Sequence, residues 1–176
     1  MSIVRISKYL LLLPFAFSAS AAFAQSSGSQ SFTVTVPQSI SITAPASAVI
    51  THDETDAAQN FQPQTWIVRG NARNGVNVTF STAQPFIHAE DNTFRRDARL
   101  TLALGTSQGP AVWTVAGSGT DATDFSSGDG VATVGASSNG VGRTNLALSV
   151  SFLTQDYGLV AAGNYVTTVT GTIAAK

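Results

Sequence analysis

A repeating alternation of apolar and polar residues is the sequence feature that most constrains the fold of this chain. In residues 31–36, phenylalanine and valine alternate with serine and threonine, and in residues 145–153 leucine, valine and phenylalanine alternate with alanine and serine. Glycine, proline, asparagine and aspartate interrupt such runs about every eight to twelve residues. Successive side chains of a β-strand point to opposite faces, so this pattern predicts many short strands that each bury one face.

Amphipathic helical patterns are absent between these runs, which argues against a parallel sheet with crossover helices. We therefore expect an all-β fold, an immunoglobulin-like or pilin-like antiparallel β-sandwich of about nine strands. Within the first strand, Pro37 cannot donate a hydrogen bond to a neighbouring strand and splits the run. The strands are expected at residues 31–42, 48–51, 65–69, 76–81, 98–104, 111–116, 131–134, 145–153 and 164–173.

The clearest strand pair is expected on either side of Asn74 and Gly75. This dipeptide separates the apolar run 66–68 from the run 76–80, and Asn-Gly readily adopts the positive φ angles of a tight hairpin turn. The sequence therefore predicts that these two runs pair directly with each other.

The N-terminus has the pattern of an export signal. Two basic residues precede an apolar run over residues 9–17, and small residues at 22–24 fit a cleavage site before Gln25. The apolar run is about ten residues long, whereas a membrane-spanning helix needs ~20. We expect a signal peptide over residues 1–24 and, after its removal, one exported domain over residues 25–176 without a membrane span. The periplasm, the cell surface and the extracellular medium are the compartments that this prediction allows.

Composition excludes several classes of function. The chain contains no cysteine, so disulfides, thiol catalysis and thiolate metal sites are ruled out. Two of the nine basic residues lie in the signal peptide, which leaves seven against ten acidic residues and a formal net charge of −3. This balance does not favour binding to nucleic acid or to an anionic membrane.

The C-terminal segment carries a family resemblance. Residues 162–173 begin Ala-Gly-Asn-Tyr and continue as an alternating Thr/Val strand. This resembles the closing strand of exported pilin-like and spore-coat-protein-U-like subunits, although the chain lacks the cysteine pair and the near-terminal tyrosine of many chaperone-usher pilins. Gly163 permits a sharp entry into the strand, and Tyr165 is the candidate for a tyrosine corner, with its ring on the core and its hydroxyl bonded to a neighbouring loop.

The resemblance implies assembly by strand addition, in which an incomplete sandwich accepts a strand from another subunit. Phe32, Val34 and Val36 are the candidate donor, because they would present alternate side chains to a groove, and residues 25–36 would then be an exchangeable N-terminal strand. The simpler alternative is that these residues form the first strand of their own domain. The implied partners are other copies of the chain or related subunits, and a secretion or assembly chaperone.

Catalytic and metal-binding patterns are sparse. His52 and His88 are the only histidines, and the chain has no nucleophile elbow, no His-Glu-x-x-His and no phosphate-binding loop. We therefore expect no enzymatic activity. Calcium is the one cofactor that we considered, because acidic residues cluster at 53–56 and 121–129. Neither cluster has the spacing of a calcium-binding loop, so we interpret both as solvated loop charge and expect no cofactor.

The expected function is that of an exported structural subunit of a surface filament, a fimbria-like assembly or a coat. The alternative is a secreted monomeric module that binds carbohydrate or another surface ligand. In that alternative Trp113 would form a stacking platform, although the absence of a second exposed aromatic residue nearby favours a core position. Trp66, between Thr65 and Ile67, is expected in the core.

Overall fold

The computed structural model describes residues 25–176. The chain consists of two separate units, and the boundary between them lies between Thr35 and Val36. Residues 25–35 contain no strand, and their side chains are exposed. The expected signal peptide over residues 1–24 lies outside the described residues. Among the residues that the structure describes, no helix is long and apolar enough to cross a membrane.

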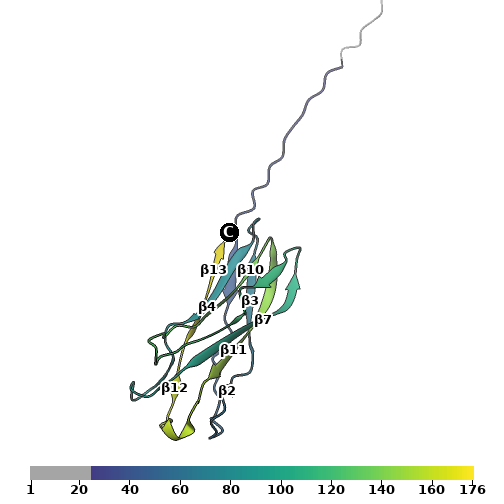
Figure 1. The fold of residues 1–176 in the computed structure, drawn as a ribbon. Helices are drawn as coiled ribbons and strands as arrows, with labels where there is room; N and C mark the ends of the chain where they lie inside the picture. Colours follow the sequence, from purple (N-terminus) through teal and green to yellow (C-terminus); the bar gives the residue numbers. More distant parts are fainter. Residues whose placement is uncertain (1–24) are drawn as a thin grey trace, which may run out of the picture. The chain divides into compact units, whose positions relative to one another are not determined.

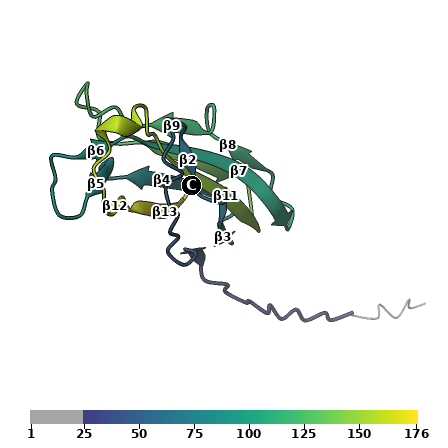
Figure 2. The same ribbon diagram turned by 90° about the horizontal axis from the view of Figure 1, so that it is seen from below.

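Residues 36–176 form antiparallel sheets with no α-helix, so the chain is all-β over this range, as the alternation predicted (Figure 1, Figure 2). The first sheet has the order β1 (Ile40–Thr43), β3 (Gln64–Gly70), β11 (Gly142–Phe152), β7 (Ala98–Gln108) and β9 (Thr120–Ala122), with β2 (Gln59–Asn60) also on β11. The second has the order β13 (Val169–Ala175), β4 (Val76–Thr82), β10 (Thr133–Ser138) and β8 (Trp113–Val115). A small third sheet joins β12 (Tyr165–Val166), β5 (Phe86–His88) and β6 (Arg95–Arg96), and one 3₁₀ turn, η1, spans Tyr157–Leu159.

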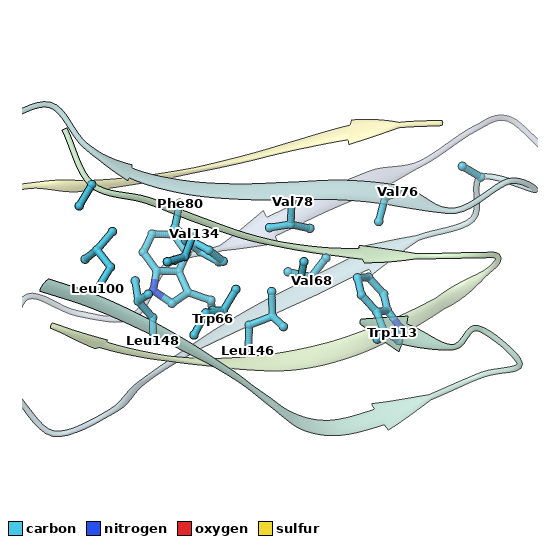
Figure 3. Packing of buried hydrophobic residues seen from close by; sticks show 14 residues of the cluster. Trp66, Val68, Val76, Val78, Phe80, Leu100, Trp113, Val134, Leu146 and Leu148 are labelled. Carbon is cyan, nitrogen blue, oxygen red and sulfur yellow. The ribbon is translucent and has the colours of Figure 1, made fainter. Parts of the chain in front are cut away.

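The two larger sheets enclose one hydrophobic core. Alternate residues of β3, β11 and β7 point into the core and face the inward-pointing residues of β4 and β10 (Figure 3). Trp66 of β3 meets Phe80 of β4 edge to face, with ring centroids 5.0 Å apart, which confirms the expected core position of Trp66. A smaller cluster of Phe86, Ala98 and Phe152 lies where β5, β7 and β11 meet. The fully buried aliphatic and aromatic side chains of the main core include Val68, Val76, Val78, Phe80, Leu100, Leu146 and Leu148.

The expected pairing across Asn74 and Gly75 is wrong. β3 pairs with β1 and β11, whereas β4 pairs with β13 and β10 in the other sheet. Gly75 does have a positive φ of 86°, and its N–H donates to the Ala72 carbonyl at 3.0 Å. The turn therefore exists, but it carries the chain from one sheet to the other, because each strand buries its apolar face against the opposite layer.

Strand boundaries differ from the expectations in three further places. Residues 31–39 and residues 48–51 belong to no strand, so only 40–43 of the first expected run is paired. The expected C-terminal strand is split into β12 and β13, which pair with β5 and β4 respectively. Thirteen strand segments result over residues 25–176, because β2, β5, β6 and β9, each only two or three residues long, lie outside the expected runs and the C-terminal run is divided.

Candidate functional site: the β1/β13 edge

Two strands from opposite ends of the domain sequence lie next to each other without pairing. Within residues 25–176, β1 pairs with β3 alone and β13 pairs with β4 alone. Their side chains nevertheless meet, since a Cβ atom on Gly171 would lie 2.9 Å from Ile42 Cδ1. Each strand therefore keeps one edge with unpaired backbone groups, on the same side of the domain.

The core is thinly covered along this side. Ile40 and Ile42 of β1, and Val169 and Ile173 of β13, face the core but are only partly buried. Core-facing residues of the inner strands, such as Phe80, are fully buried. We call this line of partly buried side chains the β1/β13 edge, and it comprises Ile40, Ile42, Val169, Gly171, Ile173 and Ala175.

β13 lacks the features by which proteins protect an exposed sheet edge. Its seven residues, Val169–Ala175, contain no charged residue and no proline. Natural edge strands are usually short, charged, bulged or covered, because unpaired N–H and C=O groups are a template for another strand. A regular, uncharged strand such as β13 is therefore competent to accept one more partner strand.

The N-terminal segment presents apolar side chains to water. Phe32, Val34 and Val36 are 85%, 87% and 75% exposed, and residues 25–39 belong to no strand. Burying such a side chain is worth about 1.5–3 kcal/mol. Three large exposed apolar residues at alternate positions therefore represent a substantial unused driving force for association.

Tyr165 makes the hydrogen bond that defines a tyrosine corner. Its hydroxyl accepts a hydrogen bond from the Ala161 N–H, four residues upstream, at 3.0 Å. The ring packs edge-on against Phe152 and His88 at centroid distances of 5.3 Å and 5.1 Å. Gly163 has a φ of 144°, and a Cβ atom there would collide with the His88 imidazole. Both residues lie in the small aromatic cluster and hold the entry to β12.

Both histidines are engaged in hydrogen bonds that hold loops. The Nδ1 atom of His88 accepts from the N–H groups of Glu90 and Asp91, and Nε2 lies 3.0 Å from the Ala162 carbonyl. In His52, Nδ1 accepts from the N–H of the residue two positions later, and Nε2 lies 2.9 Å from Thr154 Oγ1. Every ring nitrogen therefore has a hydrogen-bond partner within the domain.

Trp113 does not form the exposed platform considered for a ligand-binding module. Its side chain is 6% exposed and belongs to the main core. Its Nε1 atom has no hydrogen-bond partner in the described part of the chain. The favoured core position of Trp113 is therefore confirmed, and the stacking platform of the alternative is not formed, because β8 turns the ring inward between the two sheets.

The acidic clusters hold their own loops. The Ser126 hydroxyl and the Ser127 N–H bind Asp124, and these hydrogen bonds hold the pKa of Asp124 below its usual value. In the other cluster, the Thr55 hydroxyl does the same for the pKa of Asp53. Over residues 25–176, no three His, Cys, Asp or Glu side chains come together as a group that could hold a metal ion.

Comparisons with protein-family models, with curated proteins and with solved structures found no match to this chain. The evidence for its function is therefore the geometry itself: an all-β domain with one unprotected edge, and an exposed alternating apolar segment in the same chain. Sequence reasoning identified Phe32, Val34 and Val36, but it did not identify the β1/β13 edge. The signal for that edge was weak, because Ile40, Ile42 and the apolar residues of β13 look like any other strand residues.

Proposed function

We propose that this chain is an exported structural subunit whose copies join by strand addition into a surface filament, a fimbria-like assembly or a coat. Residues 31–36 of one copy would enter alongside β13 of another copy and cover the β1/β13 edge. The observation that carries this proposal is the coexistence of a partly buried core line with three exposed apolar side chains at alternate positions. The fold type that follows is a pilin-like sandwich completed by a strand from a second copy.

The dimensions of donor and edge agree. Six extended residues, 31–36, span about 20 Å, and the seven residues of β13 span about 23 Å at ~3.3 Å per residue. The free N–H and C=O groups of β13 would bond to the donor backbone, while Phe32, Val34 and Val36 would point toward the core. Thr33 and Thr35 would then point to solvent, as the outward-facing threonines of β13 do.

Insertion of the same residues into their own domain is the competing arrangement. The three residues 37–39 are enough for a short turn that would return residues 31–36 along β1 of the same copy. That arrangement predicts a stable monomer, whereas insertion into another copy predicts large species. For a subunit with an open edge we also propose an assembly chaperone and related subunits as partners.

The decisive experiment measures the mass of the chain from Gln25 by size-exclusion chromatography with light scattering. A donor-deficient variant carries Phe32→Asp, Val34→Asp and Val36→Asp, and a matched control carries Ser31→Asp, Thr33→Asp and Thr35→Asp. We expect large species for the unchanged chain and for the control, and a folded monomer for the donor-deficient variant. A monomeric unchanged chain, or equal assembly of all three proteins, would overturn strand addition between copies.

A further inference from the structure

Positive side chains gather at one end of the domain. Arg69 of β3 lies directly opposite Arg143 of β11. Lys176 lies at the same end, because its N–H donates to the Gly75 carbonyl and its Nζ donates to the Ser138 carbonyl. We call this the basic end, and it comprises Arg69, Arg73, Arg143 and Lys176. Within the described residues, β3, β4, β10 and β11, whose ends meet here, contain no Asp or Glu.

Carboxylates gather at the opposite end, where β2, β12 and η1 lie (Figure 1). Asp56 accepts a hydrogen bond from the Tyr157 N–H at 2.8 Å, and Asp156 caps η1. Glu90 and Asp91 follow β5, which pairs with β12 at this end. The basic residues nearby are Arg95 and Arg96 of β6. We call this the acidic end, and it comprises Asp53, Glu54, Asp56, Glu90, Asp91 and Asp156.

The charges at the two ends are not neutralised by neighbours. Within residues 25–176 no Arg or Lys lies within 4.0 Å of an Asp or Glu carboxylate, and the one such contact of a histidine is His52 with Asp53, at 4.0 Å. Like charges directly opposite each other on paired strands are destabilising, yet Arg69 and Arg143 occupy such positions. A shallow depression of about 400 Å³ lies beside them, lined also by Ser39, Asn71 and Gln108 and by glycine and valine residues. The basic end can therefore receive a carboxylate from outside the chain.

The donor segment leaves the domain from the basic end. The Asn71 side chain accepts from the Ser39 N–H at 2.6 Å and donates to the Pro37 carbonyl at 2.9 Å. Because Asn71 follows β3 at this end, residues 37–39 are fixed there. Three residues span about 10 Å at most, so a domain whose residues 31–36 are inserted in a neighbour lies close to that neighbour.

We propose that the basic end of one copy docks on the acidic end of the next, so that copies join head to tail. This inference rests on the proposed strand addition, and it assigns a direction to it. β13 runs from beside Thr82 toward Val76, which is from the acidic end to the basic end. A donor antiparallel to β13 therefore leaves the groove at the acidic end of the acceptor, and its own basic end arrives there.

A donor parallel to β13 would instead bring two basic ends together. Opposite charges about 10 Å apart lie slightly beyond one Debye length at physiological salt, which is about 8 Å, and within one Debye length below about 0.1 M salt, so this attraction is strongest at low salt. The segregation of charge thus favours antiparallel insertion and one polarity along the assembly. The partner that this surface fits is a second copy of the same chain.

The test reverses charges at each end of the full chain from Gln25. The basic-end variant is Arg69→Glu with Arg143→Glu, and the acidic-end variant is Glu54→Lys with Glu90→Lys, four positions whose side chains are not in the core. Ala103→Glu, an exposed position midway along β7 and therefore between the two ends, is the control. Assembly is followed by light scattering at 50 and 500 mM NaCl, conditions chosen to span weak and strong screening.

At low salt we expect each end variant alone to assemble about tenfold more slowly, the Ala103 control to be unchanged, and an equimolar mixture of the two end variants to recover most of the rate. High salt should slow the unchanged chain and remove these differences. Unchanged rates for both end variants, or a mixture that does not recover, would overturn the head-to-tail contact.

A second measurement separates this inference from the proposed function. A synthetic peptide of residues 25–36 is titrated into the donor-deficient variant with and without the end substitutions. Equal peptide affinity together with slowed assembly supports the end-to-end contact. Equal affinity together with unchanged assembly overturns that contact and leaves strand addition intact. A peptide that does not bind, with an unchanged chain that stays monomeric, overturns both.

Discussion

The donor segment should show a period-two dependence of affinity on sequence. In the free segment Val34 is 87% exposed, so its insertion at the β1/β13 edge would bury nearly the whole side chain. Burial of valine lies at the low end of the 1.5–3 kcal/mol range for large apolar side chains. Val34→Ser should therefore weaken binding of the residue 25–36 peptide by about 1.5 kcal/mol, which is roughly tenfold in Kd.

Neighbouring positions provide the matched control. Thr33→Ser and Thr35→Ser each remove one methyl group, but these side chains would face solvent, so the expected change in Kd is less than about twofold. Phe32→Ser should have the largest effect, near 3 kcal/mol or more than about a hundredfold, because the ring offers the most apolar area.

The assay is isothermal titration calorimetry of each peptide into the donor-deficient variant. Peptide binding should also show a negative heat-capacity change, which marks burial of apolar surface. Equal losses at position 33 and position 34 would refute the reasoning, because they would mean that the segment does not bind as a strand with one face on the core. Losses confined to the odd positions would mean that the register is inverted.

Three further predictions follow from the described residues. Tyr165→Phe should lower the free energy of unfolding by about 1–3 kcal/mol in urea denaturation, because a partly buried N–H loses its acceptor. Tyr157→Phe is the control and should change this free energy little, because the Tyr157 hydroxyl makes no hydrogen bond within residues 25–176. Gly75→Ala should lower the thermal midpoint by several degrees, because φ is 86° and a Cβ atom would collide with the backbone of Ser138 on β10. An unchanged midpoint would contradict this. Hydrogen bonds from the Ser126 hydroxyl and from backbone N–H groups lower the pKa of Asp124. Their stabilising effect is therefore present above about pH 3.8 and is lost as the pH falls through the lowered pKa. Hydrogen exchange of the 123–130 loop should accelerate in that pH range, and Asp124→Asn should abolish this acid-dependent step.

Sequence periodicity predicted many of the side chains that enter the core, whereas residues 31–36, which alternate in the same way, are exposed. The alternations around Val78 and Phe80, and around Leu146 and Leu148, correspond to side chains that are fully buried. Local chemistry also predicted the positive φ of Gly75 and the turn that it makes. These features depend on residues close together in sequence, and strand geometry couples them directly to the pattern.

Pairing could not be predicted in the same way. The two runs beside Gly75 are adjacent in sequence, yet they belong to different sheets, because each finds its apolar partners across the core and its backbone partners elsewhere. Period-two alternation states which face of a strand is buried, but it does not state which strand lies beside it. The same limit applied to Trp113, whose position in a strand was compatible with either face until the packing of β8 turned it inward.

The sequence by itself determined an all-β chain, its buried faces and the alternating apolar segment at residues 31–36. Only the tertiary structure decided that β1 and β13 lie together with unpaired edges, and that Arg69 and Arg143 lie opposite each other at the end of the domain away from the carboxylates near β2 and β12. The physical reason is that strand alternation is a local property of neighbouring residues. Sheet order and the position of charge in space depend instead on contacts between residues far apart in the chain, which one-dimensional periodicity does not encode.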